Sequence, residues 1–204
     1  MFDVNELLQS QLEHVAFWHN QPFENPEGQS FEAQALLLYH YNFELWHQED
    51  LARDKTASAH DIAKVKRAID GFNQQRQDMI EKLDECIISY LQSKKIIPAS
   101  NAPMNSETPG SVIDRLSINA LKIYHMREET LREDASEDHR QRCQSKLNIL
   151  EEQREDLGNC LHMLLNDLLS GCKYLKIYRQ MKMYNDATLN PVLYETDKRI
   201  KHET

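Results

Sequence analysis

The chain of 204 residues has the length of one domain, and its 33 acidic and 24 basic residues give a formal net charge of −9. This charge excludes general affinity for nucleic acid, because Lys and Arg side chains must neutralise the phosphates in such complexes. Glycine and proline are scarce, with 5 and 6 residues, and the stretches between them are rich in good helix formers, so the sequence predicts an all-α protein.

Apolar side chains recur at helical spacing along most of the chain. With the start and stop signals they predict helices over residues 4–18, 31–53, 61–94, 112–133 and 137–169, and a short basic helix over residues 173–184. Three helix starts carry a capping residue followed three positions later by an acid, namely Asp3 with Glu6, Ser58 with Asp61, and Ser111 with Asp114. Prolines and small polar residues predict a linker from about residue 98.

An internal repeat predicts the architecture. Residues 49–60 read EDLARDKTASAH and residues 128–139 read EETLREDASEDH, while a Trp–His pair upstream of the first copy matches a Tyr–His pair upstream of the second. We therefore expect one helical domain built as a pseudo-symmetric four-helix bundle with accessory helices at both ends. Its parts are a first hairpin over residues 30–97, a linker over 98–111, a second hairpin over 112–170, and a basic helix with a tail over 171–204.

Polar side chains that occur in both hairpins form a candidate metal or polar site. His47 and Asp50 lie on one face of the second helix, and the fourth helix repeats the pattern with His125 and Glu128 or Glu129. In an up-down-up-down bundle these helices would be parallel and diagonal, with the four groups at a similar level. Two histidines and two carboxylates suit Zn, Mn or Fe. Di-iron bundles use a Glu-x-x-His motif on two helices, and this motif occurs in only one of the hairpins here. We therefore favour histidines with a structural, hydrogen-bonding role over histidines that bind a divalent metal.

Arg76 and Arg154 occupy equivalent positions on helix faces that should be buried. A buried guanidinium needs acceptors, because leaving it unpaired costs several kcal/mol. The candidate acceptors are a bound anion or nearby polar side chains, namely Asn42, Asp70, Asp78, Glu155 and Asp156. Structural salt bridges repeated in both halves are favoured over an anion site.

Residues 172–184 contain four basic side chains, three tyrosines and no acid. The favoured role is to cover the acidic bundle, with the basic side chains paired to its carboxylates. The alternatives are docking on an anionic partner, a membrane surface or a phosphate-bearing substrate.

The remaining features concern the compartment and the assembly. The four cysteines show no CxxC pairing, which favours reduced thiols over disulfides or a zinc site. No run approaches the roughly 18 apolar residues of a membrane span, and the first residues lack the pattern of a secretory signal. The sequence therefore predicts a cytoplasmic protein without a transmembrane segment, and an exposed apolar face of the first helix would allow a homodimer.

The stretch HYNFELWHQEDLARD, together with KRAIDGFNQQRQD and DRLSINALKIYHMREE, resembles an uncharacterised bacterial family, the domain of unknown function 4254. The resemblance covers roughly residues 30–170, and its most specific residues are Asn42, Leu45, Trp46, His47, Glu49 and Asp50. The family brings no activity, cofactor or catalytic residue. Its members are encoded among glycosyltransferases of cell-surface polysaccharide synthesis, so the resemblance implies an accessory role there.

Two functional hypotheses follow. Because the sequence has no glycine-rich phosphate loop, GxSxG elbow or HExxH motif, the leading one is a non-enzymatic binding or accessory protein that takes a protein partner or a small anionic ligand. The alternative is a metal-dependent hydrolase for a phosphorylated or nucleotide-linked substrate. Its ligands would be the histidines and acids of the candidate site, and Arg76 or Arg154 would bind the anion. The sequence does not decide between them.

Overall fold

A computed structural model describes residues 2–195, and this part of the chain is helical, without β-strands. The all-α prediction is confirmed. The helices are α1 (Val4–Trp18), α2 (Phe31–Leu51), α3 (Ala59–Ser93), α4 (Pro109–Leu131), α5 (Glu137–Leu169) and the 3-10 helix η1 (Met183–Asn185).

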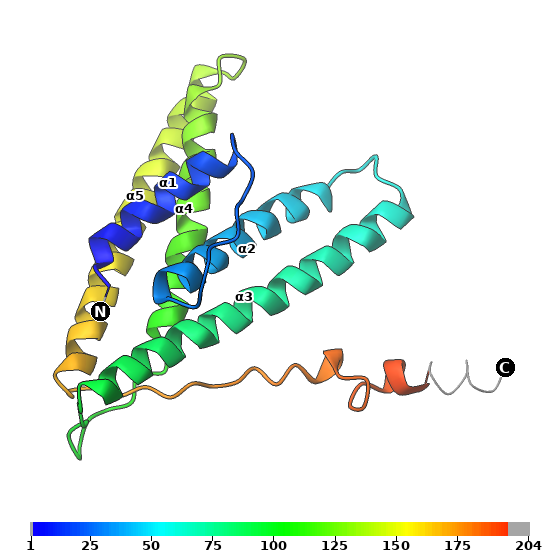
Figure 1. The fold of residues 1–204 in the computed structure, drawn as a ribbon. Helices are drawn as coiled ribbons and strands as arrows, with labels where there is room; N and C mark the ends of the chain where they lie inside the picture. The colour runs from blue at the N-terminus through cyan, green and yellow to red at the C-terminus, as the bar shows by residue number, and fades with distance from the viewer. Residues whose placement is uncertain (1, 196–204) are drawn as a thin grey trace.

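The helices pair into two hairpins, α2 with α3 and α4 with α5, as the repeat predicts. The hairpins have similar proportions, with helices of 21 and 35 residues in the first and of 23 and 33 residues in the second. They meet near the linker and spread apart toward their tips, and α1 lies across the angle between them (Figure 1). None of the helices in the described residues has an apolar stretch of the length and hydropathy needed to span a bilayer.

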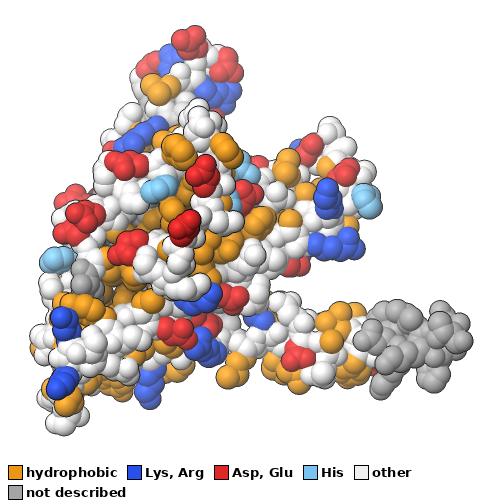
Figure 2. All heavy atoms as spheres, in the orientation of Figure 1, with side chains coloured by type: hydrophobic (Ala, Val, Ile, Leu, Met, Phe, Trp, Pro, Cys, Tyr) orange, Lys and Arg blue, Asp and Glu red, His pale blue; other side chains and the backbone are white. Residues whose placement is uncertain are grey.

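Helix α4 is the centre of the packing, because it contacts α1, α2, α3 and α5. Its Ile113 and Leu116 are fully buried, as are Leu38 of α2, Leu83 of α3 and Leu161 of α5. Hydrophobic side chains are also visible where α1 meets the two hairpins, whereas the hairpin tips carry many charged groups (Figure 2). This arrangement corrects the expected order of helices, since α2 and α4 are in direct contact and not across a diagonal.

The helix starts follow local capping chemistry. Asp3 accepts from the backbone N–H of Glu6 at 3.1 Å, and Ser58 accepts from that of Asp61 at 3.2 Å, as predicted. The expected cap at Ser111 is wrong, because α4 begins three residues earlier behind Thr108. A proline suits the first position of a helix, and Pro109 takes it here, so Ser111 and Asp114 lie inside the helix.

The predicted basic helix over residues 173–184 is also wrong. The chain leaves α5 at Gly171, whose φ of +71° belongs to the left-handed region, and then runs extended beside α3 as far as η1 (Figure 1). We call residues 172–186 the strap. Arg179 of the strap pairs with Glu81 and Glu85 of α3, and Lys173 pairs with Asp167 at 3.0 Å. Contacts with acids on neighbouring helices therefore take the place of helical hydrogen bonds.

Candidate metal centre

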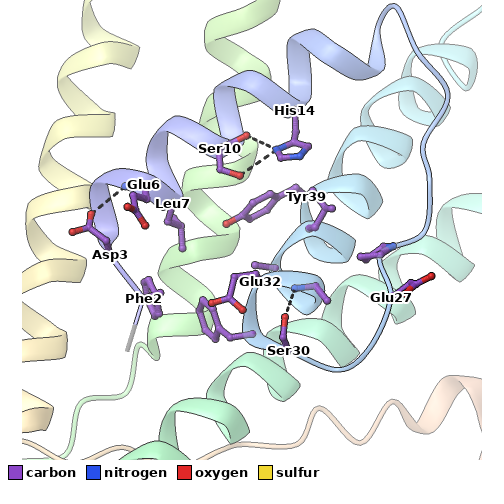
Figure 3. A pocket seen from close by; sticks show the side chains of 15 residues that line it. Phe2, Asp3, Glu6, Leu7, Ser10, His14, Glu27, Ser30, Glu32 and Tyr39 are labelled. Carbon is purple, nitrogen blue, oxygen red and sulfur yellow. Dashed lines mark hydrogen bonds between the residues drawn. The ribbon is translucent and has the colours of Figure 1, made fainter.

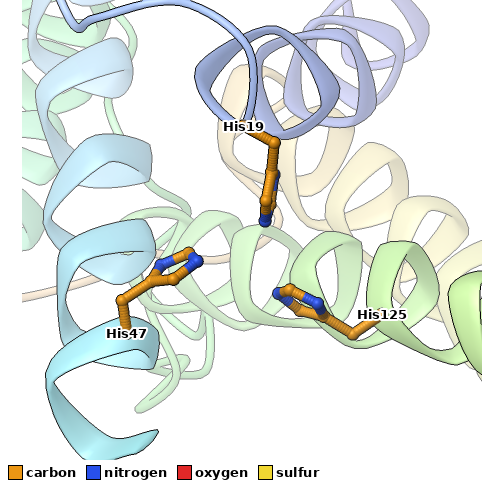
Figure 4. A group of neighbouring side chains, drawn as sticks. All are labelled: His19, His47 and His125. Atoms are coloured by element: carbon orange, nitrogen blue, oxygen red, sulfur yellow. The ribbon is translucent and has the colours of Figure 1, made fainter. Parts of the chain in front are cut away.

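Three histidines from separate parts of the chain meet where α1, α2 and α4 come together. His19 directly follows α1, His47 lies in the last turns of α2, and His125 lies on α4. One ring nitrogen of each lies within 4.8 Å of those of the other two, and the ring tips point toward one another (Figure 4). We call these residues the histidine cluster.

Hydrogen bonds on the outer side of each ring decide which nitrogen faces the centre. The Nδ1 atom of His19 lies 2.7 Å from the Val15 carbonyl oxygen, and that of His47 lies 2.8 Å from the Phe43 carbonyl oxygen. A carbonyl oxygen only accepts, so Nδ1 carries the proton in both rings. The Nε2 atoms therefore keep their lone pairs.

His125 is held in the same way by a carboxylate. Its Nδ1 atom lies 2.8 Å from Oε2 of Glu128, one helical turn further along α4. The Nε2 atoms of His19 and His125 are buried and have no hydrogen-bond partner within residues 2–195. Because buried polar atoms in folded proteins are nearly always satisfied, these two nitrogens are acceptors that a bound metal ion would satisfy.

Aromatic side chains fix the orientation of the three rings. His19 stacks on Tyr124 with centroids 4.1 Å apart, and His125 stacks on Trp46 at 4.9 Å. The ring of Phe43 lies 4.3 Å from that of His47. Such a shell restricts the movement of the rings.

Burial lowers the pKa of His19, and the neighbouring His125 and His47 lower it further. The hydrogen bond to the Val15 carbonyl and the negative charge of Glu128 partly oppose this effect. A lowered pKa favours the neutral imidazole, which is the form that binds metal ions.

The geometry suits a metal ion with nitrogen ligands. Metal-binding histidines usually donate their second ring N–H to a carbonyl or carboxylate, which is the arrangement of all three rings here. A tetrahedral zinc site has Zn–N distances of about 2.0–2.1 Å, which places its nitrogens roughly 3.3 Å apart. Binding would therefore draw the three Nε2 atoms closer together. Imidazole ligands suit Zn, Cu, Fe and Ni.

The structure brings only part of the predicted site together. His47 and His125 converge. Glu128 contacts the outer nitrogen of His125, Nδ1, and does not face the centre of the cluster. Asp50 instead lines a cavity between α2, α3 and α4. Glu129 lies 2.9 Å from His139 and 3.0 Å from Arg132 at the tip of the second hairpin, where the guanidinium competes with any metal for its carboxylate.

His19 is the residue that the sequence reasoning missed. It belongs to a third aromatic–His pair, Trp18–His19, beside Trp46–His47 and Tyr124–His125. The first pair lies outside both repeated hairpins, so a comparison of the two hairpins with each other could not find it. A search for the dipeptide alone would have done so.

The two predicted arginines find different partners. Arg76 binds Asp114 of α4 through two hydrogen bonds, from Nε at 2.7 Å and from Nη2 at 2.5 Å. Asp114 was not among the expected partners, because the sequence placed it at a helix start. Arg154 has no carboxylate partner within the described residues and donates instead to the Leu116 carbonyl at 3.0 Å, the Leu8 carbonyl at 2.5 Å and Oε1 of Gln11 at 3.1 Å.

A cavity of about 440 Å³ lies between α1 and α2 (Figure 3). Leu7 and Tyr39 form part of its wall, and Asp3, Glu6 and Glu32 stand around it. These three acids cap or occupy first helical turns, where they balance the helix dipole. Their positions are thus explained without a ligand.

Comparison with known proteins gives one match. A family model described as a protein of unknown function (DUF4254) matches residues 32–177. The match includes His47 and His125 but begins after His19. No curated protein and no solved structure matches the chain.

Proposed function

Because this chain belongs to the family of unknown function DUF4254, which brings no activity with it, we propose its function from the geometry of the histidine cluster. The protein is a metalloprotein that binds one divalent transition-metal ion, most simply Zn²⁺, through the Nε2 atoms of His19, His47 and His125. The observation that supports this proposal is the convergence of three lone pairs whose rings are each fixed through Nδ1.

Three protein ligands favour a catalytic over a structural role. Structural zinc sites are usually closed by four protein ligands, whereas catalytic sites keep one position for water or substrate. A zinc ion lowers the pKa of its bound water to about 7 and so supplies a hydroxide nucleophile near neutral pH. We therefore place the protein among metal-dependent hydrolases. Nothing in the geometry of residues 2–195 favours the accessory role in surface-polysaccharide assembly over this one.

Metal content is the direct test. The purified protein would be chelated, reconstituted with Zn²⁺ and analysed by elemental mass spectrometry, beside His19→Ala, His47→Ala and His125→Ala. We expect one ion per chain, lost in each variant but retained in His60→Ala, which removes an exposed histidine at the start of α3. If the chain retains no metal and the three variants are only less stable, the cluster is structural and the proposal fails.

Cobalt substitution tests whether a coordination position is open. The absorption spectrum of bound Co²⁺ reports its coordination number, and an exchangeable water can be replaced by azide. We expect azide to change the spectrum without displacing the metal. A spectrum insensitive to azide and to pH would indicate a closed, structural site and would remove the hydrolase assignment while leaving metal binding intact.

A further inference from the structure

Two cavities on one side of α3 share a boundary at Asn73 and Arg76. One, of about 340 Å³, lies between α2, α3 and α4, and the other, of about 460 Å³, lies between α3, the start of α4 and the strap. Because Asn73 and Arg76 line both, the cavities are neighbours with Arg76 between them, and we call the two together the groove. Their sizes are those of small-molecule sites.

The strap end of the groove favours an anion. It is lined by Arg76, Lys182 and Arg115, and Ser111 places the first turn of α4 beside them. Arg115 pairs with Glu107, which is solvent-exposed and does not line the cavity. The N-terminus of a helix carries partial positive charge, which adds to the attraction. Within residues 2–195, Lys182 donates one hydrogen bond, to the carbonyl oxygen of Asn73 at 3.3 Å, so its ammonium group keeps N–H groups for a ligand.

The acids at this end are already balanced by other cations. Asp114 is bound by two donors of Arg76, and Asp70 is paired with Lys66 in the preceding turn of α3. The third donor group of Arg76, Nη1, makes no hydrogen bond to another residue of the described chain. Held in place by Asp114, it is available to a ligand in the groove.

The other end of the groove is suited to a ring. Leu45, Trp46 and Leu121 form an apolar wall, and Glu49 and Asp50 stand at the rim. Apolar and aromatic side chains bind the flat or puckered faces of rings, while carboxylates accept hydrogen bonds from hydroxyl or amino groups. The two ends therefore match the two parts of one kind of molecule.

We propose that this groove binds a small phosphate ester with a ring-shaped body, its phosphate held by Arg115, Lys182 and Nη1 of Arg76 and its ring against Trp46. This site adjoins the histidine cluster, because Trp46 also stacks on His125, but its phosphate contacts use none of the three histidines. A monosaccharide phosphate and a nucleoside monophosphate share this chemistry, and the experiment distinguishes them.

Isothermal titration calorimetry on the full chain tests the proposal. The probes are glucose 1-phosphate and adenosine 5′-monophosphate, with glucose, adenosine and inorganic phosphate as partial ligands. We expect one of the two esters to bind at least tenfold more tightly than inorganic phosphate, and the uncharged compounds to bind least. The preferred ester then identifies the class of ring.

Matched variants locate the site. Lys182→Ala and Lys176→Ala remove two lysines of the strap, but only Lys182 lines the groove. Arg115→Ala and Arg127→Ala remove two arginines of α4, each paired with one glutamate, but only Arg115 lines the groove. We expect the two lining variants to weaken ester binding about tenfold, as the loss of a charge-assisted hydrogen bond does, and the controls to have little effect. Equal weakening in all four, or no binding of either ester at millimolar concentration, would overturn the proposal.

Discussion

Arg76 of α3 holds Asp114 of α4 through two parallel hydrogen bonds, from Nε at 2.7 Å and from Nη2 at 2.5 Å, and so joins the two hairpins. Asp114 is 4% exposed and also accepts from Asn42 of α2 at 2.9 Å. The pair raises the pKa of the Arg76 guanidinium, chiefly through the hydrogen bonds to Asp114, although burial opposes this. The guanidinium of Arg76 therefore stays ionised in the folded protein.

Arg76→Ala should destabilise the protein by about 3 kcal/mol, because it leaves a buried carboxylate without its cation. The measurement is urea unfolding. Arg127→Ala, which removes an exposed ion pair on α4, should change the free energy of unfolding by less than about 0.5 kcal/mol. In the background of Asp114→Ala the cost of losing Arg76 should shrink. An unfolding curve of Arg76→Ala that coincides with the wild type would contradict the pairing.

Arg154 should behave differently, because no carboxylate depends on it. Burial lowers its pKa to about 10, and its acceptors are two carbonyls and an amide. Helical carbonyls have other partners, so Arg154→Met should cost only about 1–2 kcal/mol. Since Leu8 and Gln11 belong to α1, hydrogen exchange of α1 amides should accelerate more than that of α3 amides. Uniform acceleration across the chain would argue against this local role.

The sequence predicted the five long helices because good helix formers and apolar side chains at helical spacing run between the turn residues. Their arrangement depends on contacts between hairpins, which no local pattern contains. The position of α4 in the middle follows from packing against four helices, and the pairing of Arg76 with Asp114 follows from that position. An acid three residues after a serine had a plausible capping role, so nothing at Asp114 indicated burial.

The histidine cluster shows the same limit on a smaller scale. Two of its members lie in the repeated hairpins and could be predicted, whereas of the acids expected beside them Glu128 contacts the outer side of the His125 ring and Asp50 lines a neighbouring cavity. The third, His19, reaches the cluster only because α1 packs across α4. The strap shows that basic and aromatic periodicity alone does not make a helix when acids on a neighbouring helix offer better partners.

Glu128→Gln tests whether the carboxylate behind His125 supports metal binding. Glutamine keeps the shape but removes the charge that orients the imidazole and increases its basicity, so Zn²⁺ affinity should fall about tenfold or more. Competition with a chromophoric chelator measures this affinity. Glu129→Gln is the matched control, because Glu129 contacts His139 and Arg132 and not the cluster. Equal affinities in wild type and Glu128→Gln would show that the carboxylate is not needed.

Asp84 of α3 should make stability depend on pH. Burial raises its pKa to about 6, although the hydrogen bonds from Thr108 and from the N–H of Gly110, at 2.8 Å, oppose the shift. A raised folded-state pKa means that the folded protein binds this proton more tightly than the unfolded chain. The stabilising contribution is therefore complete below about pH 4 and is lost as the pH rises through about 6.

Asp84→Asn should remove this pH dependence. Relative to the variant, the wild type should lose about 3 kcal/mol of stability between pH 4 and pH 7, measured by urea unfolding at each pH. Asp78→Asn, which changes an exposed acid of the same helix, should leave the wild-type profile unchanged. Parallel profiles for wild type and Asp84→Asn would contradict the raised pKa.

Two glycines in helices should respond to alanine in opposite ways. A Cβ atom at Gly110 would lie 2.6 Å from the backbone carbonyl oxygen of Ile80 and 2.9 Å from Oδ1 of Asp84, so α3 and α4 would have to separate. Gly110→Ala should therefore destabilise by about 3 kcal/mol. At Gly71 of α3 the added Cβ meets nothing within 4 Å, and Gly71→Ala should stabilise by about 0.5–1 kcal/mol because alanine favours the helix. Thermal unfolding of both variants measures this, and a tolerated Gly110→Ala would mean that the two helices are not in close contact there.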